Sequence, residues 1–203
     1  MTYTNIALNN DLLNVITYDF VKENILPKVF PAAKAFEEIA KGMICSPVLD
    51  FAVGYYIPFD GSNLRVTADL LCHVGMKRKE AVEYAMLNIE HQASIKPMCE
   101  MIGLPGNDEE ALWVVTTESG IYGAAAILSQ RVRMEISNKF GDGKIAILPS
   151  SVHEVIVYRT EQLEEDLPNL KNMVYMINRS EVSPDDRLTD SVYTLSGGEL
   201  IFA

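Results

Sequence analysis

The first part of the chain shows a helical pattern of apolar positions. Over Asn10–Lys41, apolar residues recur every three or four positions, and Asn10 or Asp11 is a suitable N-cap. Pro27 and Pro31 interrupt this pattern, and proline removes a backbone donor from the interior of a helix. We therefore expect two helical segments here, separated by a kink or a break.

Short apolar runs and amphipathic stretches then alternate. The apolar runs predict a hairpin, made of a strand over Val48–Ile57, a turn at 58–61 and a strand over Leu64–Thr67. The amphipathic stretches predict three helices, over Thr67–Gly75, Lys77–His91 and Ala93–Ile102.

The second half of the chain is more regular. The pattern predicts strands over Ala111–Thr117, Ile145–Leu148 and Val152–Tyr158, and helices over Ser129–Phe140 and Asp166–Asn178. Ser191–Leu195 and Glu199–Phe202 flank a Ser-Gly-Gly turn and predict a terminal hairpin. Strands that interleave irregularly with helices favour an α+β fold, with a mixed or antiparallel sheet, several helices and a C-terminal β-hairpin. We expect one domain over residues 1–203, with a possible division into a helix-rich part (1–104) and a sheet-rich part (105–203).

Composition is typical of a globular protein in a reducing compartment. Hydrophobic residues make up 48% of the 203 positions, and no apolar run approaches the length of a membrane span. The N-terminus lacks the basic start and apolar stretch of a secretory signal. The 3 cysteines show no CxxC spacing, which favours free thiols over a disulfide framework. We expect a cytoplasmic protein that does not associate with membranes.

Charge changes this picture in the last quarter of the chain. The formal net charge is -11, which disfavours direct binding of nucleic acid. Acidic residues concentrate after residue 160, and this surface is either a solubilising face or a docking site for a protein with a basic surface. In its sharpest form the second interpretation describes a regulatory or anti-defence inhibitor that imitates a nucleic acid. The candidate binding residues are Glu161, Glu164, Glu165, Asp166, Asp185, Asp186 and Asp190.

Several segments carry a resemblance to a known family. YGAAAIL (122–128), LPSSVHEV (148–155) and DSVY (190–193) occur in this order along the chain. With them, the region from about Asp11 onward resembles a bacterial family of unknown function. The resemblance implies a shared fold and a cytoplasmic location, and it implies no activity.

The stretch 144–159 holds the strongest candidate for catalysis. Ser151 and His153 would share one face of a strand while Glu154 points to the other, and a serine beside an imidazole is the start of a nucleophilic dyad. Ser150 is an alternative nucleophile. No GxSxG elbow surrounds either serine, and a serine at such a corner more often bonds the backbone. A small hydrolase or transferase is therefore the alternative to a non-enzymatic binding protein.

Other chemistry has little support in the sequence. Cys72 and His73 are adjacent and point apart, and HExxH and paired CxxC motifs are absent, so we expect no metal site and no cofactor. A small-ligand binding domain is a third possibility, which needs a pocket that the sequence does not reveal. A homo-oligomer is compatible with all three functions.

Overall fold

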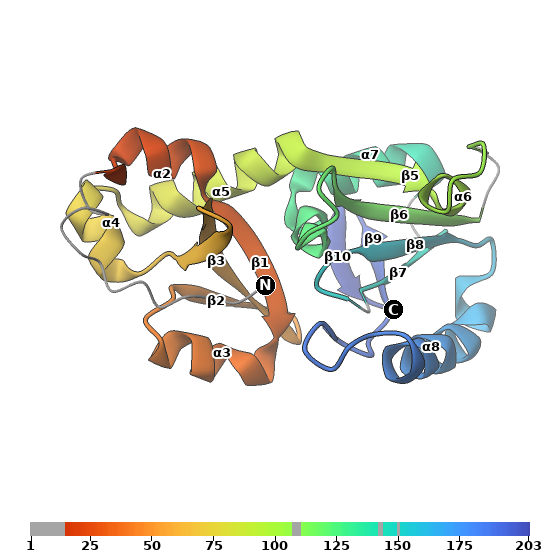
Figure 1. Ribbon diagram of the computed structural model, residues 1–203. Coiled ribbons are helices and arrows are strands. Elements are labelled where there is room, and N and C mark those ends of the chain that lie inside the picture. Colours follow the sequence, from red (N-terminus) through yellow and green to blue (C-terminus); the bar gives the residue numbers. More distant parts are fainter. Residues whose placement is uncertain (1–14, 107–110, 142–143, 150) are drawn as a thin grey trace. The chain divides into compact units, whose positions relative to one another are not determined.

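The computed structural model describes residues 15–106, 111–141, 144–149 and 151–203, and the chain divides into two compact units, Met1–His91 and Gln92–Ala203 (Figure 1). Each unit contains an antiparallel sheet with helices packed on it, so the α+β fold class is confirmed. The expectation of a single domain stays a prediction.

The first unit is built around one long strand. β3 (Phe51–Phe59) pairs antiparallel with three others: β1 (Leu26–Pro31), β2 (Cys45–Val48) and β4 (Ser62–Arg65). The first seven residues of β3 are buried, because both faces of this strand are covered. Phe30, Met43 and Ala52 form part of the core beneath α3 (Ala32–Ala40). The predicted pairing of β3 with β4 is confirmed, but the first strand begins at Phe51 and not at Val48, because Leu49 and Asp50 form the turn after β2.

The prediction of a helical stretch over Asn10–Lys41 was wrong in its centre. α2 (Tyr18–Asn24) and α3 are helical, but Leu26–Pro31 forms β1, and residues 10–14 lie outside the described residues. β1 is at the edge of its sheet. An edge strand tolerates proline where the missing N–H would face away from the neighbouring strand. Pro27 and Pro31 therefore do not break a helix; they belong to an edge strand.

Two further helices complete the first unit as predicted. α4 (Ala68–Val74) begins where Thr67 Oγ1 accepts the N–H of Leu70 and ends at Gly75, whose φ of 71° is left-handed. α5 (Arg78–Gln92) buries Ala81, Ala85 and Ile89 on one face. The helix predicted over Lys77–His91 is therefore confirmed.

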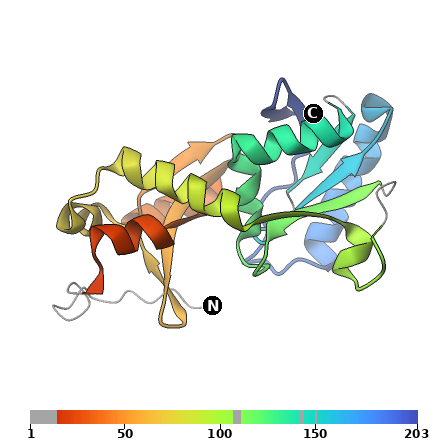
Figure 2. The same ribbon diagram turned by 90° about the horizontal axis from the view of Figure 1, so that it is seen from above.

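The second unit contains a larger sheet, with strand order β10-β9-β7-β8-β6-β5 and antiparallel pairing throughout. Its strands are β5 (Ala93–Pro97), β6 (Leu112–Thr117), β7 (Ile145–Leu148), β8 (Val155–Arg159), β9 (Tyr193–Ser196) and β10 (Glu199–Phe202). Its helices are α6 (Met98–Met101), the 3-10 helix η1 (Gly123–Leu128), α7 (Gln130–Phe140) and α8 (Leu163–Ser180). In Figure 2, α7 lies on the near side of this sheet and α8 on the far side, so helices cover both faces.

Two predictions in the second unit need correction. Ala93–Ile102 is not one helix, because its first half pairs with β6 as the edge strand β5. The strand predicted over Val152–Tyr158 begins only at Val155, because residues 152–154 form a bend. The remaining elements lie within a few residues of their expected bounds, including the C-terminal hairpin of β9 and β10.

Candidate functional site

The bend before β8 is fastened mainly by backbone hydrogen bonds. Ser151 Oγ accepts the backbone N–H of His153 at 3.0 Å, which is a local turn that serine commonly makes. The N–H of Val152 donates to the carbonyl of Asp186 at 2.8 Å, and Ser151 forms a β-bridge with Arg187. The bend is therefore joined to the loop that follows α8.

The imidazole of His153 has a partner at each nitrogen. Its Nδ1 accepts the backbone N–H of Tyr122 at 3.3 Å, and its Nε2 lies 3.3 Å from Oδ1 of Asp186. The ring also stacks on Tyr122, with centroids 5.4 Å apart and planes 11° apart. Because Nδ1 accepts a hydrogen bond, the neutral tautomer that satisfies both contacts carries its proton on Nε2. This N–H donates a hydrogen bond to Asp186.

Tyr122 is held in an unusual backbone conformation beneath this ring. Its φ is 53°, in the left-handed region that costs a non-glycine residue about 1–3 kcal/mol. The next residue, Gly123, packs so closely on β6 that a Cβ there would lie 2.4 Å from the backbone nitrogen of Thr117. Thr116 Oγ1 also donates to the carbonyl of His153 at 2.8 Å. The YGAAAIL and LPSSVHEV segments therefore support one another.

This arrangement differs from the one that a nucleophilic dyad requires. Both ring nitrogens of His153 face groups other than Ser151, whose Oγ accepts from the backbone instead. The strand alternation that placed Ser151 and His153 on one face does not apply, because these residues lie before β8. Glu154 is half-buried in the same bend, and Ser150 lies outside the described residues. Catalysis by this cluster stays a prediction.

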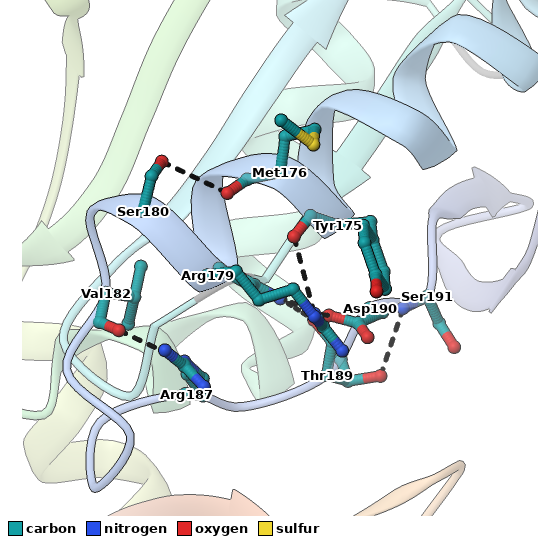
Figure 3. Close-up of polar contacts among 10 residues, drawn as sticks. Tyr175, Met176, Arg179, Ser180, Val182, Arg187, Thr189, Asp190 and Ser191 are labelled. Atoms are coloured by element: carbon teal, nitrogen blue, oxygen red, sulfur yellow. Dashed lines mark hydrogen bonds and ion pairs between the residues drawn. The ribbon is translucent and has the colours of Figure 1, made fainter.

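Several of the acidic candidates have partners within the chain. Asp186 contacts His153. Asp190 accepts a hydrogen bond from Arg179 at 2.9 Å (Figure 3) and another from Asn178 at 2.6 Å. Partial burial acts to raise the pKa of Asp190, but the hydrogen bonds from Arg179 and Asn178 outweigh it and hold this pKa below its ordinary value. These carboxylates therefore anchor the loop after α8.

The acids around the start of α8 fall into two groups. Glu161 pairs with Lys144 at 2.6 Å, and this contact lowers the pKa of the Glu161 carboxyl; Asp166 accepts a hydrogen bond from Thr160. Glu164 and Glu165 are exposed in the first turn of the helix, and neither makes an ion pair within the part of the chain that the structure describes. Of the seven acids predicted to bind a partner, these two leave their charge most available.

The far end of α8 carries a group of residues that the sequence interpretation missed. Tyr175 is 49% exposed and Met176 57% exposed, and the guanidinium of Arg179 lies 3.7 Å from the centre of the Tyr175 ring (Figure 3). Tyr, Met and Arg are enriched at protein interfaces. The signal that could have found them is helical periodicity. Leu170, Val174 and Asn178 form the buried stripe of α8, so the residues off this stripe lie on the outer face.

The described residues offer neither a metal site nor a membrane-spanning helix. Among the described residues, His, Cys, Asp and Glu side chains do not gather in threes that could hold a metal ion. Within the described ranges, every helix is too short or too polar to traverse a bilayer.

Comparison with known proteins places the chain in a family. None of the curated proteins and none of the solved structures compared with this chain matches it. A family model described as "Family of unknown function (DUF5688)" matches residues 2–196, nearly the whole chain. This chain belongs to that family of unknown function.

Proposed function

We propose that this protein acts without catalysing a reaction, by binding a protein that bears a basic surface. The observation that carries the proposal is the first turn of α8, where Glu164 and Glu165 are exposed and their charge is not balanced by an ion pair among the described residues. Carboxylates in such a position attract Lys and Arg side chains and speed the encounter with them.

A structural role for the same residues is the competing explanation. Negative charges in the first turn favour a helix through its macrodipole, by about 0.3–1 kcal/mol each. A substitution that lowers binding must therefore be separated from one that weakens α8. Glu118 and Glu135 are exposed acids elsewhere in the second unit, and replacing both removes the same charge from another surface.

The test is capture of a partner at two salt concentrations. The immobilised full chain should retain a basic protein from a lysate of its own organism at about 50 mM salt and release it at about 500 mM, because salt screens exposed charges. The double variant Glu164→Gln/Glu165→Gln should lose this protein, while Glu118→Gln/Glu135→Gln should keep it. Equal capture by both variants, or retention that does not depend on salt, would contradict the proposal.

A hydrolase or transferase is the second candidate, and one contact favours it. Asp186 beside His153 is the pairing that orients an imidazole in many nucleophilic sites. A fluorophosphonate probe followed by mass spectrometry tests this candidate. Labelling of Ser150 or Ser151 that the His153→Ala variant abolishes would support catalysis, and an unlabelled chain would exclude a serine nucleophile that reacts with this probe.

A further inference from the structure

The outer face of α8 has two chemically different ends that lie on the same stripe of the helix. Glu164 and Tyr175 are eleven positions apart, as are Glu165 and Met176. Eleven residues make about three turns, so each pair points in nearly the same direction about 16 Å apart along the axis. One end of the stripe is anionic and the other is aromatic and aliphatic.

The Tyr175 ring at the apolar end is held by contacts within the chain. Arg179 donates to the carbonyl of Tyr175 at 3.3 Å and covers one side of its ring, and Asp190 fixes Arg179 from the neighbouring loop (Figure 3). Asn178, which is 1% exposed, holds Asp190 in turn. A side chain fixed in this way loses less conformational entropy on binding, which is a property of interface hot spots.

The anionic end offers a further hydrogen-bond acceptor. Pro168 lies inside α8 and has no N–H to donate, so the carbonyl of Glu164 lacks its usual donor four residues later. Glu164 itself belongs to the exposed first turn of the helix. A Lys or Arg side chain could donate to the carbonyl and to a carboxylate together.

We infer that α8 docks an amphipathic helix of a partner protein in antiparallel orientation. This inference rests on the proposed function and specifies its partner. Lys or Arg in the last turn of the partner helix would lie against Glu164 and Glu165, where those cations also suit the partner's own macrodipole. Apolar residues about three turns earlier would pack on Tyr175 and Met176. The parallel orientation brings the cations to Arg179, and is disfavoured by repulsion.

The test uses a displayed library of 18-residue peptides, which carry strong helix formers at fixed positions and randomised residues on one face. Peptides that bind the full chain are selected from this library. Selected peptides should share apolar residues in their first half and Lys or Arg in their last turn. Tyr175→Ala/Met176→Ala should weaken their binding at least tenfold. The matched variant Met101→Ala/Met134→Ala removes two exposed methionines of the same unit and should leave binding unchanged.

Each outcome separates this inference from the function on which it rests. Peptides that depend on Glu164 and Glu165 but not on Tyr175 and Met176 would overturn the helix-docking inference and leave the proposed function standing. Peptides whose basic residues fall in the first turn would overturn the antiparallel orientation. If selection returns no helical peptide while the capture experiment still yields a salt-sensitive partner, the inference fails alone; if both fail, both are wrong.

Discussion

The Nε2 of His153 lies 3.3 Å from Oδ1 of Asp186, and this contact joins the bend before β8 to the loop after α8. The same loop carries Asp190, which fixes Arg179 and through it Tyr175. The LPSSVHEV segment is therefore connected through this loop to the outer face of α8, although its own contacts are mainly with backbone groups.

The two side chains of this contact should contribute jointly to stability. His153→Phe keeps a ring that can stack on Tyr122 but loses both polar contacts, and should lower the free energy of unfolding by about 1–2 kcal/mol. Asp186→Ala should act in the same direction. The double variant should cost about 0.5–1.5 kcal/mol less than the sum of the two single variants, because both changes remove one shared contact.

Urea unfolding followed by fluorescence measures this coupling between His153 and Asp186, and a coupling of zero would contradict the prediction. Trp113, the only tryptophan, lies in β6 and reports on the second unit.

Two glycines near η1 should respond differently to the same substitution. Gly123→Ala would place a Cβ 2.4 Å from the backbone nitrogen of Thr117, so a strand or η1 must move, at a cost of about 3 kcal/mol. Gly120→Ala meets open space and bears only the strain of its φ of 68°, about 1–2 kcal/mol. Thermal unfolding of both variants tests the order, and an equal loss of stability would show that η1 does not pack as described.

Arg133 should be the most important cation for the stability of the second unit. It is 9% exposed and donates to the carbonyls of Ile127, Leu128 and Gly198, at 3.3, 2.6 and 2.7 Å. Burial lowers the pKa of this guanidinium, while the nearby Glu199 acts to raise it. Arg133→Met should cost about 3 kcal/mol, because it leaves three carbonyls without this donor.

Arg131, two positions before Arg133, provides the control. Arg131 lies in the same helix but is exposed, and Arg131→Met should change the free energy of unfolding by less than about 0.5 kcal/mol. Both values follow from urea unfolding with Trp113 fluorescence. Similar losses for the two variants would mean that Arg133 does not hold η1 and the β9–β10 turn together.

Asp190 should make stability depend on acid pH. Its pKa is lower in the folded chain than its ordinary value near 3.9, so the unfolded state binds the proton first as pH falls. The stabilisation is complete above the unfolded pKa and is lost as pH falls through the folded pKa. The difference in unfolding free energy between the wild type and Asp190→Asn should therefore be constant from pH 6 to 7 and shrink below about pH 4. A difference that stays the same at pH 3 would contradict the role given to Arg179.

The strands that sequence analysis missed share two physical features. β1, β2 and β5 are all edge strands, and each contains proline: Pro27 and Pro31, Pro47, and Pro97. Proline normally indicates the end of an element, but an edge strand needs hydrogen-bond donors on one side only. By contrast, the helix α5 and the Gly-centred hairpin of β9 and β10 follow from local signals, and both were predicted.

The candidate site was only partly accessible from the sequence, for a different reason. The sequence singled out His153 and Asp186, but their contact depends on a loop far along the chain that no periodicity reveals. Glu164 and Glu165 were predicted as part of an acidic group that also includes Glu161 and Asp190. The structure distinguishes them, because Glu161 and Asp190 make ion pairs and the two glutamates make none among the described residues. Tyr175 and Met176 were missed because the sequence does not reveal the contacts of Arg179 with the Tyr175 ring and with Asp190.

The most direct test of the account is the salt dependence of the dissociation constant between the full chain and the captured basic partner. For the wild type, Kd should rise steeply between about 50 and 500 mM salt, since exposed charges are screened over this range. For Glu164→Gln/Glu165→Gln, Kd should be at least tenfold higher at 50 mM and approach the wild-type value at 500 mM. Two superimposed curves would contradict the proposal that the first turn of α8 recognises the partner.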